Sequence, residues 1–117
     1  MANELRLSVG LNFSKGGAKV DKNHNITVTV TGDAFTHGVQ SIDNITPTLL
    51  VEGAALGTAG YVVVKNLDAT NYVSFGLSGQ YAIKLKAGEI ALFRAAAPIY
   101  GLANVAAVSV EYAIIED

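Results

Sequence analysis

The sequence contains no cysteine and no tryptophan, and only two prolines and one methionine among 117 residues. Without cysteine the chain can form neither disulfides nor thiolate metal sites, and it has no thiol nucleophile. Charged residues are also scarce: they make up 15% of the chain, against roughly 25% in an average soluble domain. Half of the residues are hydrophobic, so the composition predicts a domain that covers part of its surface with a partner.

The distribution of charge argues against two classes of partner. The net charge is −2, and the lysines and arginines are scattered singly, so no basic stripe is present to neutralise nucleic-acid phosphates. The longest uncharged stretch, residues 95–110, is interrupted by Pro98, Gly101 and Asn104 and is shorter than the ~20 apolar residues of a membrane helix. The first residues lack the basic segment and apolar run of a signal peptide. We expect no nucleic-acid partner, no membrane partner and no export.

Alternation of apolar and polar residues predicts an all-β chain. The clearest strand is residues 5–13, in which every second residue is apolar, and residues 26–31 are β-branched throughout. Shorter strands separated by turn formers are expected at residues 39–45, 48–51, 61–65, 72–75, 81–85, 90–93 and 105–115.

These strands predict a fold and a domain count. Hairpins are expected between residues 61–65 and 72–75 and between 81–85 and 90–93, and residues 53–60 are expected to form a loop. A chain of this length holds one core. The prediction is a single domain over residues 1–117, an antiparallel β-sandwich or small barrel of the jelly-roll or immunoglobulin-like kind with about seven to nine short strands.

No residue pattern predicts catalysis or a cofactor. His24 and His37 have aspartates nearby in the sequence, but no nucleophile elbow and no ligand-type spacing accompanies them. The glycines of residues 53–60 do not follow a phosphate-binding pattern. The chain is therefore predicted to be no enzyme and to have neither a metal site nor a cofactor.

The segment of residues 94–104 is unusual, because a surface loop seldom carries several large apolar residues and only one charge. Pro98, Ile99, Tyr100 and Leu102 are the candidate interface residues. Either the segment folds back over one end of the domain, or it docks onto a neighbouring subunit. Residues 53–60 are a second, weaker candidate.

Three sequence motifs in the C-terminal half resemble a pattern of small virion proteins encoded by tailed bacteriophages. They are KN-x-D-x-TNYV at residues 65–73, I-x-L-x-AGE at residues 83–89 and V-x-V-x-Y at residues 108–112, in this order. The resemblance implies a β-sandwich that assembles on or within a virion. These motifs consist of residues that form turns and strands, and few of them are typical of a binding or catalytic site. They therefore indicate mainly a shared fold.

The function that this resemblance implies is that of an auxiliary capsid protein, also called a decoration or cement protein, which stabilises the phage head through subunit contacts. Its partners would be the major capsid protein or other virion proteins and further copies of itself, with a trimer as one option. It would be located in the virion after assembly in the host cytoplasm. The alternative is a receptor- or carbohydrate-binding module of a phage tail or fibre, whose exposed tyrosines stack on sugars.

Overall fold

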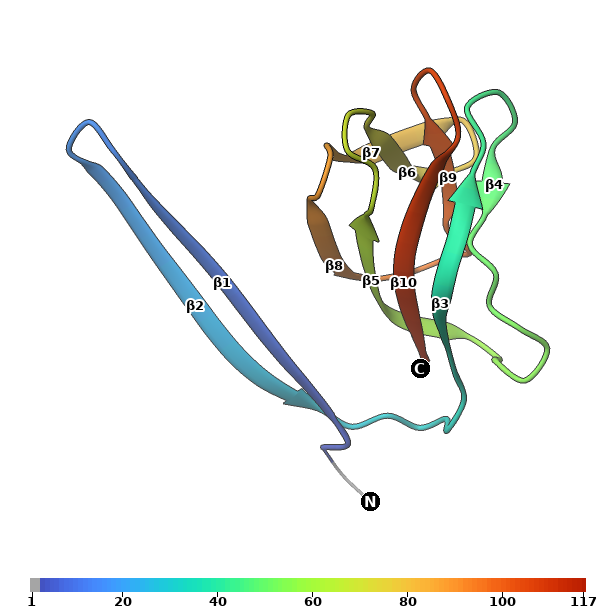
Figure 1. Cartoon of the computed structure of the whole chain (residues 1–117). Coiled ribbons are helices and arrows are strands. Elements are labelled where there is room, and N and C mark those ends of the chain that lie inside the picture. The colour runs from blue at the N-terminus through green and yellow to red at the C-terminus, as the bar shows by residue number, and fades with distance from the viewer. Residues whose placement is uncertain (1–2) are drawn as a thin grey trace. The chain divides into compact units, whose positions relative to one another are not determined.

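The computed structural model describes residues 3–117, and its described part consists of strands, turns and loops without a helix (Figure 1). Within that part, accordingly, no helix is available to cross a membrane. The all-β prediction is confirmed. The strands are β1 (Leu5–Lys15), β2 (Ala18–Val28), β3 (Phe35–Ile42), β4 (Thr48–Leu49), β5 (Ala59–Asn66), β6 (Val73–Leu77), β7 (Gln80–Leu85), β8 (Ile90–Arg94), β9 (Tyr100–Ala103) and β10 (Val108–Glu116).

The chain divides into two compact units, residues 1–31 and residues 32–117. The first unit is a two-stranded antiparallel hairpin, whose register runs from Leu5 opposite Val28 to Lys15 opposite Ala18. Gly16 and Gly17 have φ values of 56° and 88°, which a two-residue hairpin turn needs and which cost glycine little. Residues 18–25 carry no strand pattern of their own, and they are extended because they pair with β1.

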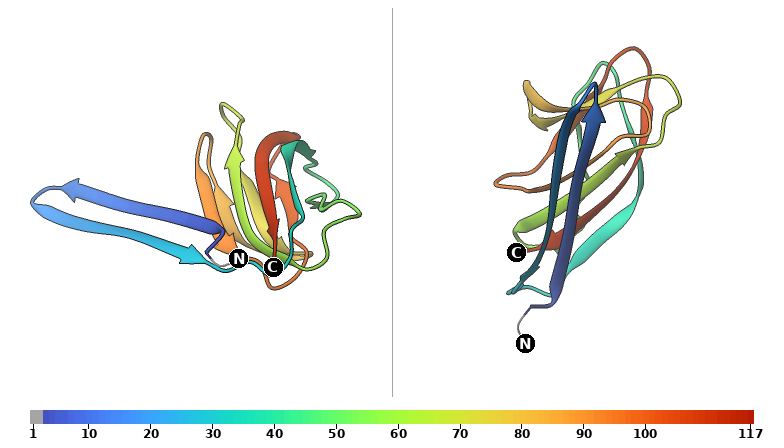
Figure 2. Two further views of the ribbon diagram at one scale, coloured as in Figure 1. Left: turned by 90° about the horizontal axis from the view of Figure 1, so that it is seen from below. Right: turned by 90° about the vertical axis from the view of Figure 1, so that its left-hand side faces the viewer.

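The second unit is a sandwich of two four-stranded antiparallel sheets, shown from two further sides in Figure 2. The strand orders are β3-β10-β5-β8 and β4-β9-β6-β7. With the eight sandwich strands counted from one in chain order, the sheets read 1-8-3-6 and 2-7-4-5. This is the order of a jelly roll, which consists of two Greek keys. The predicted sandwich is confirmed, in its jelly-roll form.

The sequence predicted one sandwich over residues 1–117, whereas the sandwich uses residues 32–117 alone and the hairpin is a unit of its own. The alternation in residues 5–13 correctly indicated a strand with one apolar face. It could not show whether a second layer covers that face, because alternation reports only the two sides of a strand.

Both predicted hairpins are wrong in the structure. β5 pairs with β10 and β8, while β6 pairs with β9 and β7, so residues 67–72 carry the chain from one sheet to the other. The turn at residues 86–89 is a second crossing, from β7 to β8. The consecutive strands that do form a hairpin here are β6 and β7. Turn-forming residues mark a change of direction, but they do not reveal which sheet the next strand joins.

The core lies between the two sheets of the sandwich and is almost entirely apolar. Its largest fully buried side chains include Phe75, Ile42 and Leu50. At Gly101 in β9, an added Cβ would lie 2.9 Å from Cε1 of Phe75 and 3.1 Å from Cγ2 of Ile42. The absence of a side chain there lets β9 approach the core closely. Strand β9 was not expected, because its residues belong to the segment predicted as a loop.

Candidate protein–protein interfaces

The hairpin has one apolar face, which we call the hairpin apolar face. It consists of every second residue of β1 from Leu5 to Phe13, together with the residues opposite them on β2: Leu5, Leu7, Val9, Leu11, Phe13, Val20, Lys22, His24, Ile26 and Val28. The other face is polar, with serines, asparagines, Arg6, Asp21 and Lys19. The sequence therefore makes this small sheet amphipathic along its whole length.

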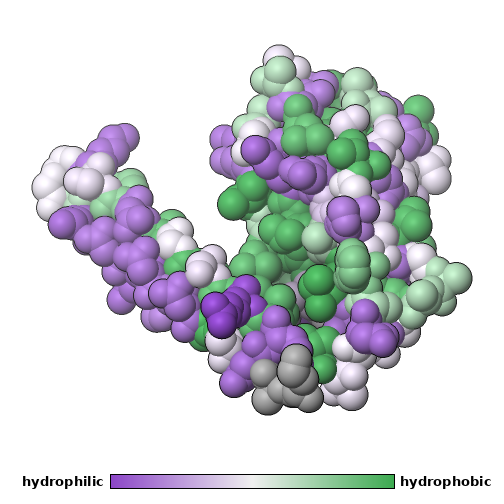
Figure 3. Space-filling view, turned by 60° about the horizontal axis from the view of Figure 1, so that its bottom comes forward, coloured by the Kyte–Doolittle hydropathy of each residue, from purple (hydrophilic) through white to green (hydrophobic). Residues whose placement is uncertain are grey.

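No second layer covers the hairpin apolar face within its own unit. Leu11 is 59% exposed and Phe13 48% exposed, while Figure 3 presents mainly the hydrophilic face of the hairpin, with hydrophobic residues visible along its edge. An isolated two-stranded hairpin is at best marginally stable in water. The hairpin also carries four basic and two acidic residues, while residues 32–117 carry four basic and eight acidic residues. The hairpin is thus a basic, amphipathic strip whose apolar side chains are not buried by other residues of its own unit.

A second apolar surface is the outer face of the β3-β10-β5-β8 sheet, which we call the outer sheet face. One row across its four strands consists of Val39, Glu111, Lys65 and Ile90, and the next of His37, Ala113, Val63 and Leu92. Val39 is 64% exposed and Ile90 65% exposed. Outward residues of a sandwich are ordinarily polar, so these rows are unusually apolar.

The outer sheet face is also hollowed. A depression of about 520 Å³ lies over it, lined by residues of both rows. The backbone of Gly38 also lines it. Figure 3 shows apolar residues gathered in the middle of the sandwich surface that it presents. At one end of the face the rings of Phe35 and His37 are stacked, with centroids 5.7 Å apart.

The predicted interface segment is divided by the structure. Ile99 packs against the core and its carbonyl accepts a hydrogen bond from the Leu50 N–H at 2.9 Å, which agrees with the alternative in which the segment folds back. Pro98 is exposed in the connection before β9. Tyr100 and Leu102 alternate with the buried residues of β9 and are half-buried on the opposite outer face of the sandwich. An interface at Pro98, Tyr100 and Leu102 stays a prediction.

The second candidate segment, residues 53–60, is anchored by a carboxylate. Glu116 accepts hydrogen bonds from the backbone N–H groups of Gly57, Asp33 and Ala34. These bonds, that of Gly57 foremost, hold the pKa of Glu116 below its usual value. Leu56 from the same segment is buried in the core. The segment is thus part of the fold, tied to β10.

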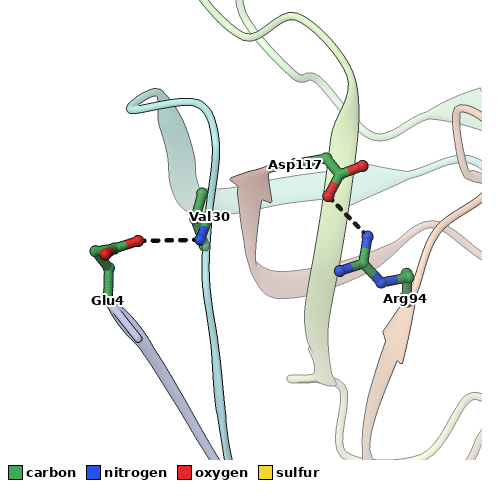
Figure 4. Close-up of polar contacts among 4 residues, drawn as sticks. All are labelled: Glu4, Val30, Arg94 and Asp117. Atoms are coloured by element: carbon green, nitrogen blue, oxygen red, sulfur yellow. Dashed lines mark hydrogen bonds and ion pairs between the residues drawn. The ribbon is translucent and has the colours of Figure 1, made fainter. Parts of the chain in front are cut away.

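Carboxylates also fix the chain near the boundary of each unit. In the hairpin unit, Glu4 accepts a hydrogen bond from the Val30 N–H at 3.0 Å. In the sandwich, Arg94 forms an ion pair with Asp117 at 2.9 Å (Figure 4). The Arg94 guanidinium also lies 4.8 Å from the ring centre of Tyr61. Both contacts lie on exposed surface, where ion pairs and hydrogen bonds contribute modestly to stability.

The motifs that carry the resemblance hold the two sheet crossings together. Asn66 is fully buried, and its Nδ2 donates to the carbonyls of Asn71 at 2.9 Å and Leu85 at 3.1 Å, while its Oδ1 accepts from the Asp68 N–H at 2.8 Å. The Asn66 backbone bonds to Gly88 and Glu89 in the second crossing. Asn66 therefore links residues 66–71 with residues 85–89. The sequence shows this asparagine in a turn, but not that it is buried.

Asp68 completes the first crossing. Its Oδ2 accepts hydrogen bonds from the N–H groups of Asn71 at 2.6 Å and Thr70 at 2.9 Å. These bonds lower the pKa of Asp68, with that from Asn71 the larger cause. The chemistry of the motif is the formation of a turn.

A small polar hollow lies on the β4-β9-β6-β7 side of the sandwich. It has a volume of about 350 Å³, and its lining includes Tyr72, Tyr81 and Asn104. The Tyr81 hydroxyl and the Asn104 Oδ1 are buried and have no hydrogen-bond partner among residues 3–117. Lys84 Nζ lies 4.2 Å from the ring centre of Tyr72. Unpartnered polar atoms beside aromatic rings are features of a site for a small polar ligand.

The two histidines lie in different units. His24 is on β2 opposite Val9, and His37 is on β3 opposite Ala113. Across residues 3–117 the structure holds no cluster of three His, Cys, Asp or Glu side chains that could bind a metal ion. Comparisons with protein-family models, with curated proteins and with solved structures found no match to this chain.

Proposed function

We propose that this chain is a non-enzymatic virion structural protein, an auxiliary capsid protein that stabilises a phage head through contacts between subunits. The observation that carries the proposal is the hairpin apolar face, which is uncovered within its own unit. A strip of this kind is ordered most readily against another protein, because burial of its apolar side chains offsets the marginal stability of two strands. The resemblance to phage virion proteins names the class of that partner.

The dimensions of the hairpin suit a contact that is repeated many times. Strands of 11 residues span about 35 Å, and two strands are about 10 Å wide. This face covers on the order of 350 Å² in plan, well under the ~800 Å² that each partner gives to a standard interface. On a symmetric shell such weak contacts add up through multivalency. The positive charge of the hairpin favours an acidic shell surface.

The jelly-roll sandwich is compatible with this role, since viral capsid proteins use it, but so do lectins. Fold alone does not decide function. The proposal therefore depends on the uncovered surface and on the resemblance, with the sandwich as the body that carries the hairpin.

Cosedimentation with purified heads that lack this protein tests the proposal. We expect the wild type to bind stoichiometrically and Leu11→Asp to weaken binding at least tenfold, because it places a carboxylate on the hairpin apolar face. Asn12→Asp is the matched control, since it adds the same group to the opposite face and should change binding less than twofold. Equal binding of both variants, or no binding of the wild type, would refute the proposal.

A receptor- or carbohydrate-binding module of a tail or fibre is the second candidate function. The observation in its favour is the polar hollow with the unpartnered Tyr81 hydroxyl. Calorimetric titration with polysaccharide from the host surface would test it. In this case Tyr81→Phe, which removes only the hydroxyl, should weaken binding tenfold or more, while the hairpin variants should have no effect.

A further inference from the structure

We infer that two copies of this chain form a dimer by packing their outer sheet faces against each other. This inference is separate from shell binding, because it uses the β3-β10-β5-β8 sheet and a second copy of the chain in place of the hairpin and a shell protein. It starts from an apolar sheet face that carries the opposite charges of Glu111 and Lys65 side by side in one row, with Arg94 at the end of β8 on the same side.

The order of residues across the sheet makes this face self-complementary. A two-fold axis that runs parallel to the strands, midway between β10 and β5, places β10 of one copy over β5 of the other. Glu111 then lies over the partner's Lys65, and Lys65 over the partner's Glu111. A C2 interface of this kind repeats each contact twice, so one pairing rule produces two ion pairs at the centre.

The apolar residues match under the same operation. Val39 on β3 falls over the partner's Ile90 on β8, and Ala113 falls over the partner's Val63, because each pair shares a row of the register. Aligned sheets pack with their strands within about 30° of each other, which preserves this correspondence best near the centre. Apolar side chains of both copies thus cover the hollow over Gly38.

The alternative two-fold axis, perpendicular to the strands, is disfavoured by the charges. With that axis between the two rows, β10 would lie over β10 of the partner and Glu111 over the partner's Ala113, so the carboxylate would meet no opposite charge of the partner. Burial of a charge against an apolar partner surface is unfavourable. Among the described residues the ion pairs are Lys19–Asp21 and Arg94–Asp117, so neither Glu111 nor Lys65 forms one there.

The size of the face sets the expected affinity. Four strands at ~4.8 Å spacing and about six residues per strand give a face of about 20 Å by 20 Å, or roughly 400 Å² in plan. The face is at the low end of specific interfaces, so we expect a dimer that dissociates at roughly micromolar concentration. A dimer of this strength is measurable at the concentrations of ordinary solution experiments.

Sedimentation velocity of the full chain between about 1 and 200 µM tests the dimer. Val39→Lys should raise the dissociation constant at least tenfold, because it places a charge over the partner's Ile90. Val105→Lys is the matched control: Val105 is 68% exposed in a loop, and its replacement should change the constant less than twofold. A wild-type chain that stays monomeric at 200 µM would overturn the inference.

A mixing experiment tests the geometry. Glu111→Lys brings lysine over lysine in its own dimer, and Lys65→Glu brings glutamate over glutamate, so each variant alone should be monomeric. Mixed in equal amounts they should form a heterodimer, since each new charge then meets its opposite. Failure of the mixture to associate, with both variants folded by circular dichroism, would contradict the proposed axis.

The hairpin variants separate this inference from the proposed function. Leu11→Asp should leave the dimer intact while it weakens shell binding, and Val39→Lys should leave shell binding by the hairpin in place. A dimer that Leu11→Asp abolishes and Val39→Lys spares would assign self-association to the hairpin and overturn the inference.

Discussion

Replacement of Asn66 by alanine should destabilise the sandwich by about 2–5 kcal/mol. The change removes three hydrogen bonds of a fully buried side chain. The Leu85 carbonyl loses its partner at a buried site, at a cost of about 1–3 kcal/mol, while the part-buried Asn71 carbonyl and Asp68 N–H regain water at about 0.5–1 kcal/mol each. A domain of this size is stable by roughly 5–15 kcal/mol, so the loss is a large share of the total.

Equilibrium unfolding in urea measures this loss. With a slope of about 1–2 kcal/mol per molar, the midpoint should fall by about 2 M. Asn71→Ala is the control in the same turn: the backbone of Asn71 makes the hydrogen bonds, and its side chain makes none among the described residues, so we expect less than about 1 kcal/mol. If Asn66→Ala costs no more than Asn71→Ala, Asn66 does not hold the two crossings together.

Three further predictions concern stability. The pKa of Glu116 is lowered in the folded state, so the ionised carboxylate stabilises the fold at pH values above its unfolded pKa near 4.5. This stabilisation is lost as the pH falls through the folded pKa. Urea midpoints at pH 7 and pH 3 should therefore differ less in Glu116→Gln than in the wild type. Gly101→Ala should cost about 1–3 kcal/mol, because its Cβ would press on Phe75, and an unchanged thermal midpoint would contradict this. Residues 32–117 produced alone should keep the β-type circular dichroism and cooperative melting of the sandwich. A peptide of residues 3–31 should show little β-structure, because two strands alone are marginally stable. A sandwich that fails to fold without the hairpin would refute the division into two units.

The positions of the strands were largely predictable, and their partners were not. Each expected strand has a counterpart in the structure, because alternation and turn residues are local signals. Pairing is not local: β10 lies between β3 and β5, and nothing in the sequence of residues 108–116 identifies these neighbours. Strand β9 was missed because Gly101 and Ala103, its inward residues, are too small to produce an apolar alternation.

The candidate surfaces were also predictable only where they depend on local sequence. The apolar face of residues 5–13 is visible in the sequence, but its exposure depends on whether a second layer exists. The outer sheet face could not be predicted at all, because Val39, Val63 and Ile90 come from three strands and become neighbours only through the register. Ile99 was predicted as an interface residue together with Tyr100 and Leu102, although it packs on the core. In the sequence, an apolar residue of a connecting segment looks the same whether it packs on the core or faces a partner.

The central place of β10 has a consequence for synthesis of the chain. Because β10 supplies the middle of the β3-β10-β5-β8 sheet, β3 and β5 have no common neighbour until the ribosome has made residues 108–116. The sandwich must therefore wait for its last strand and then close a long loop between β3 and β10. During that interval the nascent chain exposes unpaired strand edges, which are prone to aggregation. Folding of the sandwich is thus a late, slow event in the synthesis of the chain.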